Sequence, residues 1–330
     1  MAQPKEPMRW GFVGAGNIVR LFIEGLKQVE DAKVTAVYDK YIEAADKFAA
    51  EQGIEHTFDD IDAFLESGLF DIVYIAVPHP LHLEFAKRAL NAKFPVLCEK
   101  PICPTAKQVR ELIACAKEND CFLMEAFWQR FFPVSRQVCA WIEQGKIGEL
   151  VAADGVFTFV GPCVPGNRLY EPAAAGGSLL DIGTYLVNYM NMVFQTQPEK
   201  MTAVAQMTPS GVDRAAAFAF AYKEGGVASF LTSFDADSQE GMSIIGTKGV
   251  IHVDAHYWRP HSASLMTEDT TTRFECKVEG RGFQYEVMHV QDCIRKGLKE
   301  SPVMPLADSL GDMETCDTLR QIMGVVYPFE

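Results

Sequence analysis

A lysine at the end of an apolar run is the first residue whose position suggests chemistry. The run Val96–Pro101 (VLCEKP) ends in a carboxylate, Glu99, an ammonium, Lys100, and a proline. Ligands of open parallel sheets bind just outside the carboxyl ends of the strands, so we expect Lys100 to face such a crevice. Pro101 restricts Lys100 to extended conformations, which aims its side chain. The alternative is a surface lysine paired with Glu99.

A second motif supplies a candidate acid/base. The segment Gly176–Tyr185 (GGSLLDIGTY) opens a helix expected to run to about Phe194, so Asp181 and Tyr185, four residues apart, share one face. Alcohol oxidation needs a base for the hydroxyl proton, and a neighbouring ammonium lowers the pKa of a tyrosine from about 10. We expect Tyr185 to be this base beside Lys100, with Asp181 bonding a substrate hydroxyl or orienting the lysine. The alternative makes Asp181 a helix-start carboxylate favoured by the macrodipole and Tyr185 a core residue.

A glycine turn at residues 14–16 (GAG) follows an apolar strand expected over 9–13 and opens a helix. Gly14 allows the chain to turn tightly, and Gly16 lets the backbone approach a pyrophosphate at the helix N-terminus. Val19 occupies the third position of the dinucleotide-binding fingerprint, where Gly or Ala is expected, and must widen the helix–strand packing slightly. The pattern predicts a dinucleotide site, with a merely structural turn as the alternative.

The end of the next expected strand, 34–38, bears on which dinucleotide binds. Asp39 is placed to accept hydrogen bonds from the adenosine ribose hydroxyls and to repel a 2′-phosphate. Two like charges at ~4 Å cost up to ~4 kcal/mol at an effective dielectric near 20. Lys40 offsets much of this by clamping a phosphate, so the balance favours NAD over NADP without excluding NADP. The alternative makes Asp39 a solvated turn residue.

A histidine pair follows the apolar strand expected over 71–77. His79 and His82 lie three apart with Pro80 between them and no evident carboxylate partner, so we predict no metal site there. We expect this loop to cover the nicotinamide side of the cofactor, with His82 at a helix start. The residues expected to contact the cofactor are Gly14, Gly16, Asn17, Ile18, Asp39, Lys40, Pro78, His79, His82, Glu99 and Lys100.

The elements that position these motifs fall into two parts, because the pattern changes after about Phe127. The first third alternates strands and helices, which predicts an α/β domain with a doubly wound parallel sheet over residues 1–125. The remainder, 126–330, contains several short alternating runs with glycine-marked hairpins between some of them, and two closing helices. It predicts an α+β domain with an open, mostly antiparallel sheet and helices on one face.

Bulk composition limits the classes of function. A length of 330 residues favours two domains, and 48% hydrophobic residues suffice for two cores. A net charge of −14 disfavours nucleic acid and anionic membranes as partners. The N-terminus has no apolar signal core, and no run reaches the ~18 apolar residues of a membrane helix. Nine cysteines, several inside apolar segments, predict reduced thiols in the cytoplasm and no structural zinc site.

The motifs together resemble those of the glucose–fructose oxidoreductase/inositol dehydrogenase (Gfo/Idh/MocA) superfamily. The turn at 14–16, Glu99-Lys100-Pro101 and Gly176–Tyr185 match its motifs in order, over essentially the whole chain. Within it, the chain is most similar to the dimeric dihydrodiol dehydrogenase branch, also called NADP-dependent D-xylose 1-dehydrogenases. The stretches that carry this likeness are Leu123–Pro133 (LMEAFWQRFFP), Cys293–Pro302 (CIRKGLKESP) and Gly324–Pro328 (GVVYP).

The resemblance implies roles for individual residues. Lys100 and Tyr185 form the catalytic pair, Asp181 and Trp128 line the substrate site, and Arg168 lies in the substrate loop 161–172. Residues 1–125 then bind NAD(P), and residues 126–330 bind substrate and dimerise through the open face of their sheet. Many superfamily members have His in place of Tyr185, and tyrosine fits the dihydrodiol branch. That branch usually has Arg or Ser-Arg where this chain has Asp39-Lys40.

The function expected from these observations is oxidoreduction. An NAD(P)-dependent enzyme would move hydride between the nicotinamide and a hydroxyl-bearing carbon of a sugar, cyclic polyol or trans-dihydrodiol, and would form a homodimer, with a tetramer as the alternative. A non-catalytic NAD(P)-binding regulator that senses redox state is the second hypothesis. A zinc alcohol dehydrogenase is the third, and it predicts bound metal that the cysteine spacing does not support.

Overall fold

The computed structural model describes residues 6–162, 164 and 166–330. The expectation that the N-terminus lacks a signal core falls mostly on residues 1–5, outside this part of the chain. The described residues divide into two compact units, which we treat separately. The first comprises the chain up to Cys103, Lys107–Trp128 and Glu279–Leu306, and the second comprises Pro104–Ala106, Gln129–Val278 and Ala307–Glu330.

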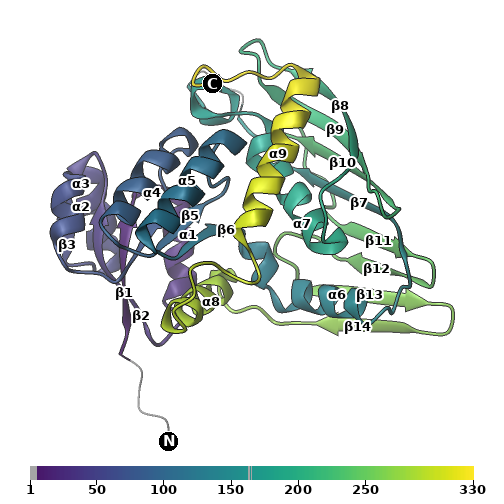
Figure 1. Cartoon of the computed structure of the whole chain (residues 1–330), viewed down its shortest axis with the longest axis horizontal. Coiled ribbons are helices and arrows are strands. Elements are labelled where there is room, and N and C mark those ends of the chain that lie inside the picture. Colours follow the sequence, from purple (N-terminus) through teal and green to yellow (C-terminus); the bar gives the residue numbers. More distant parts are fainter. Residues whose placement is uncertain (1–5, 163, 165) are drawn as a thin grey trace, which may run out of the picture. The chain divides into compact units, whose positions relative to one another are not determined.

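Within the described residues, six parallel strands form the sheet of the first unit, in the order β3-β2-β1-β4-β5-β6 (Figure 1). This is the strand order of a Rossmann fold, with the switch point between β1 and β4. Four of these strands, β1, β4, β5 and β6, are buried almost throughout, as expected for a sheet covered on both faces. Their bounds are β1 (Met8–Val13), β2 (Ala32–Tyr38), β3 (His56–Phe58), β4 (Ile72–Ile75), β5 (Val96–Glu99) and β6 (Leu123–Ala126).

Helices cover this sheet, and one of them comes from far along the chain. In Figure 1, α4 and α5 (blue) lie in front of the sheet. The helix α8, near the end of the chain, packs against α1. The bounds are α1 (Asn17–Leu26), α2 (Ile42–Gln52), α3 (Ile61–Glu66), α4 (His82–Asn91), α5 (Ala106–Asn119) and α8 (Phe283–Arg295), with the 3₁₀ helices η1 (His79–Leu81) and η2 (Trp128–Phe131).

The return of α8 differs from the expected division at residue 125. Residues 279–306 belong to the first compact unit, although the sequence pattern groups them with the second. The physical reason lies partly at Gly25 of α1, where a Cβ would lie 2.6 Å from the Cβ of Phe283. The missing side chain lets the two helices approach closely. Phe283 then packs its ring 5.7 Å from that of Phe22, also on α1.

The second unit is built on a larger sheet, in which the described residues form eight strands in the order β14-β13-β12-β11-β7-β10-β9-β8. Pairing is antiparallel except between β7 and β10, which run parallel. The fold class is therefore as expected. The bounds are β7 (Leu150–Thr158), β8 (Lys200–Met207), β9 (Asp213–Ala221), β10 (Val227–Ser233), β11 (Met242–Gly246), β12 (Gly249–Val253), β13 (Ser262–Thr267) and β14 (Thr271–Glu275).

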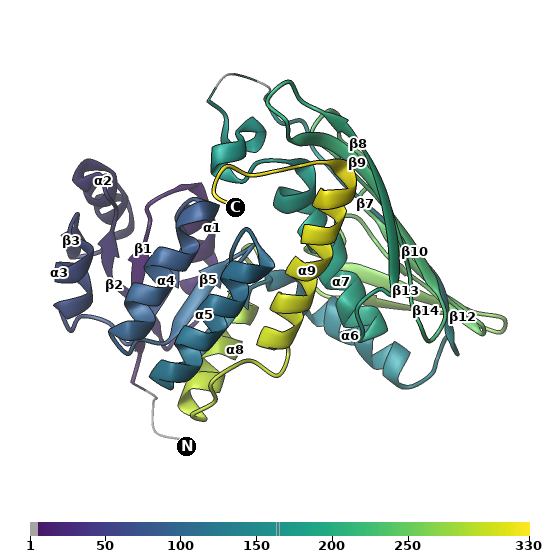
Figure 2. The same cartoon turned by 45° about the horizontal axis from the view of Figure 1, so that its top comes forward.

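Helices α6 (Pro133–Glu143), α7 (Thr184–Phe194) and α9 (Leu306–Met323) lie on one face of this sheet in both views (Figures 1 and 2). Alternation along β10 shows why: Ala228, Phe230 and Thr232 are buried, whereas Val227 and Leu231 on the opposite face are exposed. Short helical segments complete the unit, namely η3 (Arg168–Tyr170), η4 (Pro172–Ala174) and the π-helical turn η5 (Leu179–Gly183). No helix among the described residues is long and apolar enough to cross a membrane.

Candidate functional site

The glycine turn has the geometry of a phosphate site. Gly14 adopts a φ of 108°, and a Cβ there would lie 2.5 Å from the carbonyl oxygen of Ala76, just beyond β4. Gly16 caps α1 with no side-chain hydrogen bond, and no described atom lies within 4 Å of where its Cβ would be. Asn17 and Ile18 follow in the first turn of α1. The start of α1 is therefore uncapped by a side chain and open beside Gly16, as an anion site at a helix N-terminus requires.

Asp39 is held across this turn by the main chain. Its Oδ2 accepts a hydrogen bond from the N–H of Ala15 at 3.0 Å, and its Oδ1 accepts one from the N–H of Tyr41, also at 3.0 Å. The ammonium of Lys40 lies over the ring of Tyr41, 4.6 Å from its centroid. The carboxylate is thus fixed beside the glycine turn, while the lysine packs on the neighbouring tyrosine.

A pocket of about 330 Å³ connects these residues. Five residues expected at the cofactor line it, namely Gly14, Gly16, Asp39, Lys40 and Pro78. Its other walls are mostly apolar, which suits a flat heteroaromatic ring. The sequence reasoning missed these walls, although Leu81 and Phe85 stand four apart on the helical segment after His79. The missed lining residues are Ala15, Tyr38, Tyr41, Ala44, Ala76, Val77, Leu81 and Phe85.

His82 lies at the start of α4, as expected, but its ring is fully buried. Nδ1 lies 2.9 Å from the carbonyl oxygen of Pro101, and Nε2 lies 2.8 Å from that of Val77. Burial lowers the pKa of His82, and the charge of Lys100 lowers it further. Both ring nitrogens face main-chain carbonyls, so the ring joins the end of β4 to the turn after Lys100 and has no nitrogen directed at a cofactor. His79, in η1, is also largely buried.

The turn that carries Lys100 is held from several sides. Glu99, buried at the end of β5, accepts a hydrogen bond from the hydroxyl of Tyr74 at 2.6 Å and one from the N–H of Lys100 at 3.2 Å. Glu125 on β6 accepts the N–H of Ile102 at 2.8 Å. Burial raises the pKa of Glu99. Glu99 therefore supports the strand end from inside the fold, and Lys100 itself is half-buried.

A second buried carboxyl lies in this region of the first unit. Glu286 on α8 is fully buried, and neither of its oxygens has a hydrogen-bond partner among the described residues. Burial, reinforced by the charge of Glu99, raises its pKa well above the ordinary value. A carboxyl group in such surroundings holds its proton, since an isolated buried charge is costly.

Trp128, expected to line the substrate site, lies in η2 and is largely buried. Its ring stacks on that of Phe283 from α8, with centroids 4.0 Å apart and planes at 11°. The stack fixes the orientation of both rings.

In the second unit, two glycines explain the start of the Gly176–Tyr185 motif. Gly177 has a φ of 117°, and a Cβ there would lie 2.3 Å from Oδ1 of Asp213. A Cβ at Gly176 would lie 2.7 Å from the carbonyl oxygens of residues 168 and 169. Oδ2 of Asp213 accepts hydrogen bonds from the hydroxyl of Ser178 and the N–H of Leu179, both at 2.7 Å. Asp213, whose pKa burial raises to about 6, is thus the carboxylate at this helix start.

Asp181 lies in the π-helical turn η5, and α7 begins only at Thr184. The expected four-residue α-helical spacing between Asp181 and Tyr185 therefore spans two kinds of helix. Oδ1 of Asp181 accepts a hydrogen bond from Nη1 of Arg168 at 2.9 Å. The carboxylate is 8% exposed and the arginine 55% exposed, so the pair reaches from the interior to the surface. π-Helical turns are frequent at functional sites.

Tyr185 lies in an aromatic group that the sequence reasoning missed. Its ring centroid is 5.4 Å from that of Phe157 and 6.5 Å from that of Trp258. Phe157 and Trp258 are stacked, with their ring planes at 4° and their centroids 5.2 Å apart. The indole N–H of Trp258 donates to Glu240 at 2.9 Å. In the fully described stretch from Ala175 to Asn191, every residue except Tyr185 is buried.

Lys100, the glycine turn and Trp128 belong to the first unit, and Arg168, Asp181 and Tyr185 belong to the second. Among the residues that the structure describes, no group of three His, Cys, Asp or Glu side chains is arranged to hold a metal ion.

Two family models match the chain. Residues 8–127 match the Gfo/Idh/MocA oxidoreductase family with its NAD-binding Rossmann fold, and residues 135–281 match the Gfo/Idh/MocA C-terminal domain. A relative in Xenopus tropicalis, named trans-1,2-dihydrobenzene-1,2-diol dehydrogenase, is 34% identical over 329 residues, covering 97% of this chain and 99% of its own. The human protein of the same name is 34% identical over 332 residues, covering 97% and 98%.

Solved structures show the same fold. KijD10, a 3-ketoreductase from Actinomadura kijaniata in complex with NADP and TDP-benzene, superposes with a TM-score of 0.85 at 25% identity, covering 96% of this chain and 98% of that one. A levoglucosan dehydrogenase in complex with NADH and levoglucosan gives a TM-score of 0.87 at 19% identity, covering 97% and 98%.

Proposed function

Because the chain belongs to the Gfo/Idh/MocA family of NAD(P)-binding oxidoreductases and is a dehydrogenase acting on CH–OH groups, we propose that Tyr185 is its acid/base and Lys100 assists it. Under this proposal the substrate is a sugar, a cyclic polyol or a trans-dihydrodiol. The observation that carries the proposal is the partial exposure of Tyr185, next to the ring of Phe157, within an otherwise buried stretch. A phenol placed there can reach a substrate hydroxyl.

The proposed reaction moves one proton and one hydride. A nicotinamide cofactor held by the first unit would supply the acceptor for the hydride from the carbon that bears the hydroxyl. Tyr185 takes the hydroxyl proton in oxidation and returns it in reduction. The positive charge of Lys100 favours the phenolate form of the tyrosine and the developing negative charge on the substrate oxygen. Such acid/base assistance is typically worth about 10²–10⁴ in rate.

The residues of the first unit fit a dinucleotide. The uncapped start of α1 beside Gly16 suits the pyrophosphate, and the pocket of about 330 Å³ beyond β2 and β4 suits the adenosine half. Asp39 stands where the ribose hydroxyls would be recognised. Its fixed carboxylate would lie close to a 2′-phosphate, which supports NAD as the preferred cofactor, and Lys40 is the residue that keeps NADP usable.

The aromatic rings in the second unit bear on the substrate. Phe157 and Trp258 form a stacked pair beside Tyr185, and aromatic rings at this place suit contact with a sugar ring or a cyclic diol. The curated relatives are named for a dihydrodiol of benzene, which fits such a surface. We assign Asp181, supported by Arg168, the role of hydrogen-bonding a second substrate hydroxyl. Trp128 is assigned to the wall of the substrate site.

A homodimer is part of the same proposal. The face of the large sheet that carries no helix in the described part of the chain exposes Val204 (71%), Val227 (54%) and Leu231 (44%). Apolar side chains on a broad sheet face suit a second copy of the same surface. Sedimentation should give a dimer, and Leu231→Glu should shift it toward monomer.

The eight described cysteines are free thiols, which supports a cytoplasmic location.

The deciding experiment is a panel of aldoses, inositols and dihydrodiols, run with both NAD and NADP and followed at the absorbance of the reduced nicotinamide. We expect turnover with at least one class and a loss of about 10²-fold or more in kcat for Tyr185→Phe. Less than tenfold loss would remove the acid/base role. Absence of turnover across the whole panel would favour the non-catalytic regulator.

A further inference from the structure

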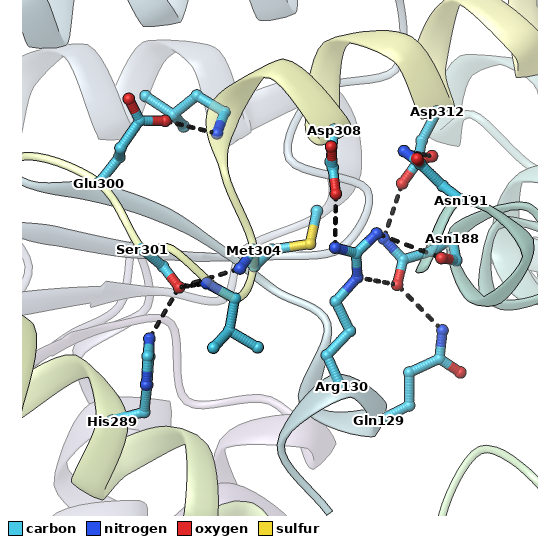
Figure 3. Close-up of polar contacts among 12 residues, drawn as sticks. Gln129, Arg130, Asn188, Asn191, His289, Glu300, Ser301, Met304, Asp308 and Asp312 are labelled. Atoms are coloured by element: carbon cyan, nitrogen blue, oxygen red, sulfur yellow. Dashed lines mark hydrogen bonds and ion pairs between the residues drawn. The ribbon is translucent and has the colours of Figure 1, made fainter. Parts of the chain in front are cut away.

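We propose that Gln129, Arg130 and Asn188 form a positioning network that sets the place of Tyr185, an inference that rests on the acid/base role given to Tyr185 above. None of the three touches reacting atoms under this proposal. They act through the backbone of α7, the helix that carries the tyrosine. Figure 3 shows the network, with Gln129 and Arg130 rising toward Asn188 and the carboxylates of α9 beyond them.

Gln129 contacts the helix at the catalytic position itself. Its Nε2 donates to the carbonyl oxygen of Tyr185 at 2.9 Å and to Oδ1 of Asn188 at 3.1 Å. Both hydrogens of the Gln129 amide group are therefore donated to acceptors on α7. The side chain is fully buried, and its Oε1 has no partner among the residues the structure describes. A buried acceptor without a partner lowers the stability of the fold. Gln129 therefore makes its two donations to α7 at a cost in stability.

Arg130 adds a charged clamp one residue further along the chain. Its Nε donates to Oδ1 of Asn188 at 2.9 Å, and Nη2 donates to the Asn188 carbonyl oxygen at 3.2 Å. Its Nη1 bonds Oδ2 of Asp308, in the first turn of α9, at 2.6 Å. The guanidinium is 2% exposed. Charge-assisted bonds in such a dry setting are stronger and more directional than neutral ones.

Asn188 is the centre of the network. Its Oδ1 accepts hydrogen bonds from Nε2 of Gln129 and Nε of Arg130, and its Nδ2 donates to Asp312 of α9 at 2.7 Å. Asp312 also accepts from Asn191 at 2.9 Å. Tyr185, Asn188 and Asn191 follow at three-residue intervals on α7, so their contacts form one stripe along the helix. The stripe pins the first turns of α7 against α9.

The network lies close to points where the chain enters the second unit. The chain enters the second unit at Pro104, Gln129 and Ala307, and Gln129, Arg130 and Asp308 stand within two residues of the last two entries. Both entry points are thereby tied to the helix turn that carries Tyr185. A displacement of about 1 Å in a reacting group can cost about 10²-fold in rate. A network that fixes this turn therefore bears on kcat more than on the binding of cofactor.

The test compares two conservative variants. Gln129→Met keeps length and removes both donations, and Arg130→Lys keeps the charge and removes the donation from Nε to Asn188. We expect kcat to fall about 10–100-fold in each, with KM for cofactor changed less than about threefold. Because the proposed function has Lys100 favour the phenolate of Tyr185, displacing the tyrosine should move the kcat/KM profile to higher pH.

The matched control is Thr315→Val, which removes a buried hydrogen bond from α9 to Gln197 (3.0 Å) on a different part of the second unit. It should lower the melting temperature without moving the pH profile. Unchanged kcat and pH profile in both network variants would overturn the positioning role while Tyr185→Phe still loses activity. Near-normal activity of Tyr185→Phe would overturn the proposed function and this inference together. If Gln129→Met does not fold, Gln129→Asn, which shortens the reach by one methylene, takes its place under the same criteria.

Discussion

Nη1 of Arg168 lies 2.9 Å from Oδ1 of Asp181, so an exposed cation holds a buried carboxylate at the surface end of the π-helical turn. The sequence places these two residues in different segments, and the fold joins them. Asp181 lies in the first turn of η5, and Asp213 accepts the N–H of Leu179 at the same helix start, so two carboxylates share this end. Asp181 is thus oriented by an arginine whose side chain is exposed to solvent.

Replacing Arg168 should separate function from stability. An ion pair with one exposed partner contributes at most about 1 kcal/mol, so Arg168→Gln should unfold in urea almost as the parent does. Its kcat/KM for the organic substrate should fall about tenfold, because Asp181 loses its orientation. Cofactor affinity, measured by fluorescence titration, is the internal control and should not change. A variant that loses stability but keeps kcat/KM would show a structural pair.

Gly177→Ala should be strongly destabilising. The Cβ would meet Oδ1 of Asp213 at 2.3 Å, and the φ of 117° is unfavourable for any side chain. We expect a loss of about 2–4 kcal/mol in the free energy of unfolding. Gly53→Ala is the matched control, since φ is 75° there and no described atom lies within 4 Å of the new Cβ. The control should lose about 1 kcal/mol. Equal losses in the two variants would contradict the clash.

Glu286→Gln should change how stability depends on pH. Burial raises the pKa of Glu286 well above 4.5, so the folded protein keeps this proton after the unfolded chain has released it. Stability therefore falls as the pH rises above about 4.5, until the pH passes the folded-state pKa. The glutamine variant lacks this loss. In urea unfolding, the stability of the glutamine variant relative to the parent should increase from pH 5 to pH 8. Glu286→Ala, which leaves a cavity, should be less stable than the parent at pH 5. A glutamine variant that is less stable at pH 8 would show that the ionised carboxylate has a partner.

His82→Leu should reduce activity through the lysine turn. The neutral ring has one N–H, which can donate to the carbonyl oxygen of either Val77 or Pro101, so losing this bond should cost about 1–3 kcal/mol in stability. A loosened Lys100 turn should lower kcat about tenfold. His82→Gln, whose amide can donate to both carbonyls, should recover part of both losses. Full activity in the leucine variant would separate His82 from the lysine.

Asp39→Ser should shift the cofactor preference. Removing the carboxylate ends the repulsion of a 2′-phosphate, so the ratio of kcat/KM for NADP to that for NAD should rise about 10–100-fold. The same change removes the bonds to the N–H groups of Ala15 and Tyr41, so affinity for NAD should fall. Asp46→Ser, on the exposed side of α2, controls for net charge. An unchanged ratio would mean that Asp39 serves the turn alone.

The sequence predicts the parallel sheet well because its buried strands are continuous apolar runs, such as β4 and β5, followed by amphipathic helices. It misses β3 and α3, since three residues, His56–Phe58, and a single short turn carry little periodicity. The parallel pairing of β7 with β10 joins residues about 75 apart in the chain, which no local pattern encodes.

The candidate site likewise contains residues that the sequence predicts and residues that it misses. Gly14 and Gly16 are predicted because a single turn explains them, and Asp39 because it ends the next strand. Phe157 and Trp258 are missed because one lies in a strand and the other in a loop a hundred residues later, and only tertiary packing brings their rings together. The orientation of His82 is missed because the atoms facing both ring nitrogens are main-chain carbonyl oxygens.

The return of α8 to the first unit has a consequence for how the protein is made. The Rossmann sheet is complete at residue 126, but α1 lacks the helix that covers it until residues 283–295 have been synthesised. On the ribosome, the nucleotide-binding half must therefore wait for nearly the whole chain, with the bare surface around Gly25 and Phe22 open to chaperones in the meantime. A nascent chain stalled at residue 280 should be cut readily by protease in its first hundred residues, and one released past residue 306 should resist.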